Sequence, residues 1–187
     1  MYSEDEIAVM ESDIDIIKRT CKVAGFVTGA LTSHGDVDTA VMRRLIQASK
    51  PLPVIFHRAI DVSCDPMKQL ATLESLGVER VLTSGGHLTA LNGSLTIKQM
   101  VHSGLKIQIL AGAGVHEENV AELVKRTGVT EVHGSFRETT ASNMDFRPEA
   151  CIYMGAEKMN DRLTEFSLKQ VSASRVTKLK FALADIN

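Results

Sequence analysis

The sequence predicts an α/β fold in which a parallel sheet or barrel is built from repeated βα units. Five short runs of apolar and β-branched residues begin near Phe26, Val54, Val81, Ile107 and Val132, so successive runs start 25 to 28 residues apart. Glycine or polar residues close each run, and helix-like stretches separate the runs. This interval is the length of one βα unit. Because parallel strands place their chemistry where strands end and loops begin, candidate site residues are expected in the five short stretches at the strand ends.

The chain opens on a predicted helix. Ser3 and Glu6 have the spacing of a capping box, in which each side chain accepts a hydrogen bond from a backbone N–H at the helix start. One helical stripe then carries Ile7, Met10, Ile14, Ile17 and Cys21. Gly25 is expected to end this helix.

Five strands and their connecting helices follow. The strands are expected at residues 25–31, 53–61, 80–86, 107–114 and 131–137. A helix through Val41 and Leu45 should end before Pro51, because the residue before a proline disfavours helical geometry. Asp65 and Pro66 have the pattern of an N-cap and first helical residue. A further helix is predicted at 117–125, closed by a glycine at 128.

The repeat ends after residue 137. Residues 138–168 are polar and irregular and are expected to form a long surface segment, and a last helix from about Ser174 should pack back on the domain. A closed (β/α)₈ barrel needs eight units, roughly 215 residues. We therefore expect a single partial barrel domain over residues 1–187, in which either the sheet is open or about three units are absent.

Composition excludes several classes of partner. The net charge is −2, without a long run of either sign, which argues against nucleic acid or an anionic membrane. No apolar run approaches the roughly 18 residues that span a bilayer, and the first ten residues are acidic, unlike a secretory signal. Cys21, Cys64 and Cys151 are odd in number and far apart, which favours reduced thiols. A cytosolic protein that binds a small molecule, an ion or another protein is expected.

Histidine placement gives the strongest site signal. Five of the six histidines fall at the end of a predicted strand or just after it, whereas His102 lies within a predicted helix. The five are His34, His57, His87, His116 and His133. On parallel strands they would gather at one rim, where imidazoles can bind a metal or transfer protons. The alternative is five independent placements in loops, where histidine is common.

His57, Arg58 and Asp61 form the densest polar cluster of any predicted strand. Buried parallel strands are usually apolar, so these side chains require partners or a cavity. Strand alternation places His57 and Arg58 on opposite sides. An Arg58–Asp61 ion pair that holds the loop and a catalytic role are both compatible with the pattern. In the fifth strand, His133 and Ser135 share a polar face with a glutamate at 131.

Two glycine-containing loops could bring backbone N–H groups to an anion. Their candidate residues are Thr83, Ser84, Gly85 and Gly86 after the third strand and Gly112 and Gly114 after the fourth. Barrels often hold phosphate in loops that follow their last strands. Tight turns between strand and helix also require glycine, so plain turn geometry is the alternative.

Several co-linear motifs resemble the copper homeostasis protein CutC family. They are GFVTGALTSHGDVD at 25–38, FHRAID at 56–61, RVLTSGG at 80–86, ILAGAGV at 109–115 and TEVHGSFR at 130–137. The resemblance implies a TIM-type barrel and a cytoplasmic or nuclear protein associated with copper. Family members carry additional N-terminal strands with cysteines that are natural Cu(I) ligands, so those units are expected to be absent here. Residues carried over from the motifs are His57, Arg58, Asp61, Thr83, Ser84, Gly112, Gly114, His133 and Ser135.

Three hypotheses follow. The first is a copper-handling protein with His57 and His133 as metal ligands at the barrel mouth. The second is a barrel enzyme acting on a small phosphorylated molecule, with His57, Arg58, Asp61 and His133 as catalytic candidates and Ser135 among the anion-binding residues. The third is an inactive shortened form whose exposed sheet edges favour association, for example as a homo-oligomer. The residues leave open whether the protein is an enzyme.

Overall fold

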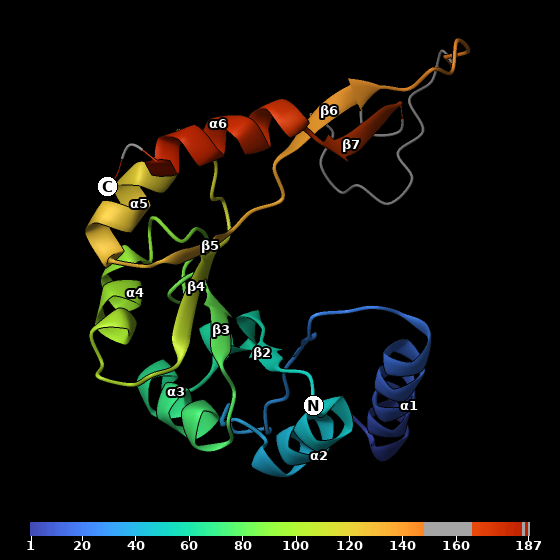
Figure 1. Cartoon of the computed structure of the whole chain (residues 1–187), viewed down its shortest axis with the longest axis vertical. Helices are drawn as coiled ribbons and strands as arrows, with labels where there is room; N and C mark the ends of the chain where they lie inside the picture. Colours follow the sequence, from blue (N-terminus) through green and yellow to red (C-terminus); the bar gives the residue numbers. More distant parts are fainter. Residues whose placement is uncertain (148–165, 185, 187) are drawn as a thin grey trace.

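Five short parallel strands form one curved, open sheet with helices along its outer side (Figure 1). The structure, a computed structural model, describes residues 1–147, 166–184 and 186. The sheet has the order β1-β2-β3-β4-β5, and every neighbouring pair is parallel. Its strands are β1 (Phe26–Thr28), β2 (Val54–Phe56), β3 (Arg80–Thr83), β4 (Gln108–Gly112) and β5 (Glu131–His133). The predicted α/β class and parallel sheet are confirmed, and the sheet is not closed into a barrel within the described residues.

Four helices connect successive strands and cover one face of the sheet: α2 (Thr39–Ser49), α3 (Pro66–Ser75), α4 (Ser94–Val101) and α5 (Val120–Thr127). Helix α1 (Glu4–Thr20) precedes β1 and packs on α2, and α6 (Ala173–Ala184) ends the chain and packs on α5. A 3₁₀ helix, η1 (Arg58–Val62), follows β2. Phe56, Val81 and Ala111 are fully buried and belong to the core on this outer face. The core therefore lies between the convex face of the sheet and its helices.

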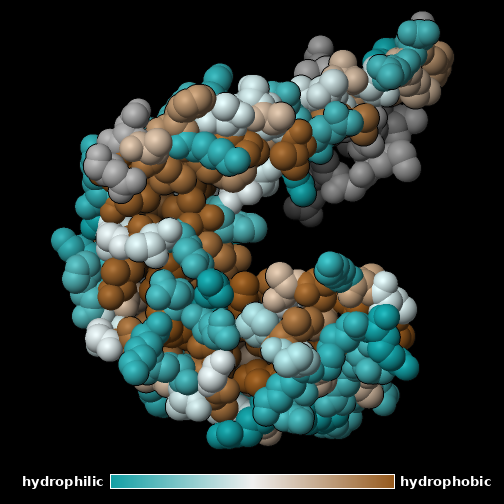
Figure 2. Space-filling model, in the orientation of Figure 1, coloured by the Kyte–Doolittle hydropathy of each residue, from teal (hydrophilic) through white to brown (hydrophobic). Residues whose placement is uncertain are grey.

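The opposite, concave face of the sheet is open. Side chains alternate along a strand, so Val27 and Ile55 point away from the buried Val54 and Phe56. Val27 is 61% exposed, and Leu82 and Leu110 are half-buried on the same face. Parallel sheets are normally covered on both faces. Here apolar surface lines part of the hollow of a C-shaped molecule (Figure 2).

The predicted first helix is confirmed. Ser3 and Glu6 make the capping box in both directions, and Ile7 and Ile14 from the predicted stripe are buried. The helix ends at Thr20 and not near Gly25, because Cys21 already has extended backbone angles (φ −125°, ψ 150°). The predicted caps of the next helices also form: Asp65 caps α3 with proline at its first turn, and Gly128 ends α5 in the left-handed conformation.

The predicted strands are longer than the observed ones, and the second strand shows why. Predicted at 53–61, it ends at Phe56, after which His57 caps η1 and accepts a hydrogen bond from the Ala59 N–H. The prediction that alternation places His57 and Arg58 on opposite sides of a strand is therefore wrong. Within a 3₁₀ turn, residues three apart lie on the same side, which brings Arg58 and Asp61 together.

The segment after residue 137 is more regular than predicted. Strands β6 (Arg137–Ala141) and β7 (Ser167–Val171) pair in antiparallel fashion, and α6 follows at the position expected for the last helix. The β-branched residues of β6 were the missed signal. Residues 148–165, including Cys151, lie outside the described part. His102, predicted inside a helix, is the C-cap of α4.

Candidate functional site

The Asp61 carboxylate is the centre of the densest polar network at the carboxyl ends of the strands. It accepts hydrogen bonds from Thr83 Oγ1 (2.5 Å), from the backbone N–H of Ser84 (3.0 Å) and from Ser84 Oγ (2.9 Å). The Gly86 N–H donates to it over 3.2 Å. The loop that we predicted as an anion cradle therefore holds an anion supplied by the chain itself.

Arg58 completes this network. Its Nε donates to Asp61 Oδ2 over 2.7 Å, and its Nη2 donates to Ser84 Oγ over 2.8 Å. The Asp61 side chain is 6% exposed, whereas that of Arg58 is 45% exposed. The ion pair that holds the loop, one of the two interpretations of these residues, is thus present. A catalytic role for either residue stays a prediction.

The network keeps Asp61 ionised. Burial raises the pKa of Asp61, but hydrogen bonds from Thr83, Arg58 and the backbone of Ser84 outweigh it and lower the pKa below its usual value. A carboxylate stabilised in this way is a weak base. Its position favours a structural role that ties the second βα unit to the third.

Close backbone contacts shape the loop after β3, which contains Ser84, Gly85 and Gly86. One of the glycines that allow these contacts, Gly93, was not predicted from the sequence. Gly85 adopts φ +71°, and a Cβ there would lie 2.4 Å from the carbonyl oxygen of Gly93. A Cβ on Gly93 would lie 1.9 Å from the carbonyl oxygen of Ser84. Real Cβ atoms do not approach backbone so closely, so both glycines are required. Gly93 stands ten residues beyond β3, outside the strand ends that we considered.

His57 and His133 are not neighbours in the sheet. His57 follows β2 and His133 ends β5, with β3 and β4 between them. At the usual spacing of adjacent strands, three steps separate them by roughly 14 Å. One metal ion that binds two imidazoles holds their nitrogens within about 4 Å of each other. The imidazoles of His57 and His133 would have to bridge this backbone separation, and their role as a pair of metal ligands stays a prediction.

The surroundings of the two imidazoles differ. His57 is half-buried, its Nδ1 accepts from the Ala59 N–H over 3.2 Å, and its ring lies against Gly29, where a Cβ would approach within 2.7 Å. This hydrogen bond requires an unprotonated Nδ1, so the neutral ring carries its proton on Nε2. His133 is exposed beside Gly112. Across the described residues, no group of three or more His, Cys, Asp or Glu side chains could hold a metal ion.

The other predicted anion-binding residues lie apart from the Asp61 network. Gly112 is buried, and a Cβ there would meet Leu82 at 2.6 Å, so it serves close packing. Gly114 adopts φ +65° in the turn after β4. Ser135, predicted within the fifth strand, lies two residues beyond its end and is exposed. Binding of an external anion at these positions stays a prediction.

A second polar cluster, not predicted from sequence, surrounds Asp36. Gln69 Nε2 donates to Asp36 Oδ1 over 2.7 Å, Lys68 Nζ lies 3.2 Å from it, and Cys64 Sγ lies 3.5 Å from it. Hydrogen bonds from Lys68, Gln69 and Cys64 lower the pKa of Asp36. The cluster places the exposed Cys64 thiol in the loop that follows η1, on the carboxyl side of β2.

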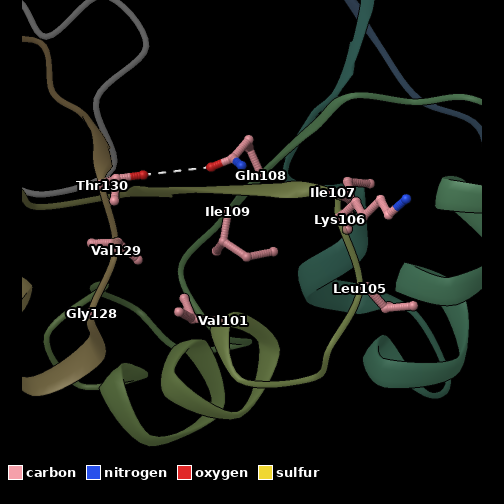
Figure 3. Close-up of a pocket in the computed structure, with 9 residues that line it drawn as sticks. All are labelled: Val101, Leu105, Lys106, Ile107, Gln108, Ile109, Gly128, Val129 and Thr130. Atoms are coloured by element: carbon pink, nitrogen blue, oxygen red, sulfur yellow. Dashed lines mark hydrogen bonds between the residues drawn. The ribbon is translucent and has the colours of Figure 1, made fainter.

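A well-defined pocket lies on the opposite rim, at the amino ends of β4 and β5 (Figure 3). It has a volume of about 230 Å³. Its lining residues are Val101, Leu105, Lys106, Ile107, Gln108, Ile109, Gly128, Val129 and Thr130. The Thr130 hydroxyl donates to Gln108 Oε1 over 3.5 Å across its mouth. Lys106 is its one ionisable lining residue, and the lining contains no His, Cys, Asp or Glu side chain that could bind a metal.

Comparison with known proteins decides the family. The model of the CutC family matches residues 1–138. This chain belongs to the CutC family. A CutC family protein of Pasteurella multocida is 42% identical over 163 residues, which cover 87% of this chain and 66% of that protein. A mouse copper homeostasis protein cutC homolog is 38% identical over the whole chain and 67% of its own length.

A solved structure supports the same assignment. The CutC protein of Streptococcus agalactiae superimposes with a TM-score of 0.66 at 32% identity, over 72% of this chain and 66% of that one. The resemblance inferred from the motifs is therefore confirmed. This CutC chain spans about two thirds of the length of the relatives that it matches.

Proposed function

We propose that this chain acts in copper homeostasis by binding or transferring copper(I). The observation that carries the proposal is its 38–42% identity to CutC proteins over 87–100% of its length, including a mouse relative named for copper homeostasis. The match to the mouse relative covers the whole chain and so includes the strand ends that carry the candidate ligands. Every helix that the structure describes is too short or too polar to cross a membrane. The proposed location is the cytoplasm, with the nucleus as the alternative.

The candidate copper ligands lie on the carboxyl side of the sheet. His57 and His133 supply imidazole nitrogens there, on strands that do not adjoin. Of the two cysteines that the structure describes, Cys64 follows the carboxyl end of β2, whereas Cys21 precedes β1. Thiolate sulfur is the ligand that selects Cu(I) most strongly. Cys64 is therefore added to the two histidines as a candidate.

The experiment is an anaerobic Cu(I) competition titration against a chromogenic chelator. We expect Cys64→Ser and the combined His57→Ala and His133→Ala variant each to lower the affinity about tenfold or more, equivalent to about 1.4 kcal/mol. Cys21→Ser and His102→Ala are matched controls, because both residues are exposed and lie away from the carboxyl side. Equal affinity in all four variants would show that these residues are not copper ligands. Absence of Cu(I) binding by the unmodified chain would contradict the proposed function.

The structure gives no support to an enzyme acting on a phosphorylated molecule. The donors of Thr83, Ser84 and Gly86 that would bind phosphate are directed at Asp61. A phosphate entering there would have to displace a buried carboxylate.

A further inference from the structure

An ion pair crosses a whole strand of the sheet. Arg80 begins β3 and Glu131 begins β5, with β4 between them. Arg80 Nε donates to both carboxylate oxygens of Glu131, over 3.1 and 2.9 Å. Strands two steps apart in a sheet are separated by roughly 10 Å at the usual spacing. The two side chains therefore extend toward each other over β4.

Both side chains lie on the concave face of the sheet. Val81 is fully buried in the core on the convex face, so its neighbour Arg80 faces the hollow. Glu131 is in register with Leu110, and the residue after Leu110, Ala111, is buried in the same core. Side chains on a concave face converge as a sheet bends. A contact across that face therefore resists flattening of the sheet.

No other ion pair of the described residues joins two strands of the sheet. The remaining pairs connect helices, loops or near neighbours in the chain. A closed barrel fixes the curvature of its sheet through strand number and shear. Within the described residues this sheet is open, so closure does not fix its curvature. The contact between Arg80 and Glu131 is placed to do so.

The pair is partly shielded from water, which favours a stable contact. The Arg80 side chain is 35% exposed and the Glu131 side chain 32% exposed. Attraction between charges is stronger in such a position than between two fully exposed side chains. Because one nitrogen binds both carboxylate oxygens, the direction of the contact across β4 is also defined.

We propose that the Arg80–Glu131 pair is a strap that holds the curvature of the open sheet. The strap draws the amino ends of β3 and β5 together and so sets the angle between the βα units on either side of β4. Because β2 adjoins β3, the strap also sets how far the carboxyl end of β5, with His133, lies from that of β2, with His57. The proposal concerns the shape of the sheet and holds whether or not the chain binds copper.

The test is a distance measurement by double electron–electron resonance across the opening of the molecule. One spin label is attached to the exposed Cys21 at the end of α1, and the other to Lys178→Cys on α6, in a chain whose other cysteines are replaced by serine. Helices α1 and α6 lie on opposite sides of the opening (Figure 1), so flattening of the sheet moves the labels apart. Dilution with unlabelled chain restricts the measurement to distances within one molecule.

Glu131→Gln and Glu79→Gln are the matched variants. Both remove a carboxylate from Arg80, but Glu79 adjoins it in the chain, lies 3.5 Å from its Nη1 and is 61% exposed. We expect Glu131→Gln to lengthen the mean distance by several ångströms and to broaden its distribution, and Glu79→Gln to leave both unchanged. Arg80→Glu and Glu131→Arg should each open the sheet further, because like charges then face each other over β4. The combined reversal should restore the unmodified distance.

An unchanged distribution in Glu131→Gln and in both single reversals would show that helix packing alone sets the curvature, which overturns the proposal. Equal lengthening in Glu79→Gln also overturns it, since the effect would then come from the charge at Arg80 and not from the contact across β4. Circular dichroism checks that each variant is folded. If a single reversal unfolds the chain, the combined reversal decides: recovery of the unmodified distance supports the strap, and failure to recover it overturns the proposal.

Discussion

Ser84 donates two hydrogen bonds to Asp61, one from its backbone N–H over 3.0 Å and one from its hydroxyl over 2.9 Å. Asp61 follows β2 and Ser84 follows β3, so this contact joins two successive βα units at their carboxyl ends. Both groups are shielded from water, because Ser84 is fully buried and the Asp61 side chain is 6% exposed. The loop geometry at this rim depends on the carboxylate.

Replacing Asp61 should therefore be costly. In Asp61→Asn the amide nitrogen would face N–H and O–H donors and leave Arg58 without its charge partner, so we expect a loss of about 2–4 kcal/mol in the free energy of unfolding. Urea denaturation measures it. Asp15→Asn is the control, because the Asp15–Arg19 pair is exposed on α1 and its loss should cost no more than about 1 kcal/mol. Equal losses in the two variants would contradict the structural role of Asp61.

Gly93→Ala should destabilise the same loop through backbone contact. The added Cβ would lie 1.9 Å from the Ser84 carbonyl oxygen, so one of the two segments must move. Gly77→Ala is a matched comparison, since Gly77 has φ +82° but no atom within 4 Å of its Cβ position. Strain alone should cost Gly77→Ala about 1 kcal/mol, and Gly93→Ala should lose clearly more in thermal denaturation. A larger loss of stability in Gly77→Ala than in Gly93→Ala would show that the loop after β3 moves aside at little cost.

Acid should weaken the attachment of α6 to the segment between β4 and α5, where Glu117 lies. Hydrogen bonds from Arg175 hold the pKa of Glu117 at about 2, below its usual 4.5. Because the folded-state pKa is the lower one, this pair stabilises the fold fully above pH 4.5 and loses its contribution as the pH falls toward 2. Melting temperatures measured across this range should fall less steeply for Glu117→Gln than for the unmodified chain. Parallel pH profiles would argue that the pair contributes nothing.

His57 should stabilise the start of η1 as well as any copper site. Its Nδ1 accepts from the Ala59 N–H, so His57→Ala should lose about 0.5–2 kcal/mol of stability, whereas His57→Asn keeps a capping oxygen and should lose less. Both variants remove the imidazole and should weaken Cu(I) binding to the same extent. Denaturation combined with the Cu(I) titration thus separates the capping role from the ligand role. If His57→Asn binds Cu(I) more tightly than His57→Ala, in the same order as their stabilities, then His57 affects copper binding only by stabilising the fold.

The repeat spacing was sufficient to predict the class of fold. Strand starts near Phe26, Val54 and Val81 match β1, β2 and β3, because an apolar run between turn residues is a local property of the chain. The Ser3–Glu6 capping box and the Gly128 helix end were predictable for the same reason. The ends of strands were less predictable, since His57 could extend a strand or cap a turn.

The candidate site was predictable in membership but not in arrangement. Arg58, Asp61, Thr83 and Ser84 were all selected from the sequence, and the structure joins them in one network. The sequence did not show which group would accept the hydrogen bonds of the loop after β3. That depended on η1, the 3₁₀ turn that directs the Asp61 carboxylate toward β3. The requirement for glycine at position 93 arises from a backbone contact with Ser84, nine residues earlier. A contact of this kind produces no recognisable pattern in the local sequence.

By itself, the sequence determined the βα repeat, the caps of its helices and membership of the CutC family, because each is written in short, contiguous patterns. Tertiary structure alone decided that Asp61 accepts the hydrogen bonds of the LTSGG loop, that two strands separate His57 from His133, and that α1 and α6 lie on opposite sides of the opening in the molecule. These relations join residues distant along the chain. They follow from strand order and sheet curvature, which the packing of the whole molecule sets.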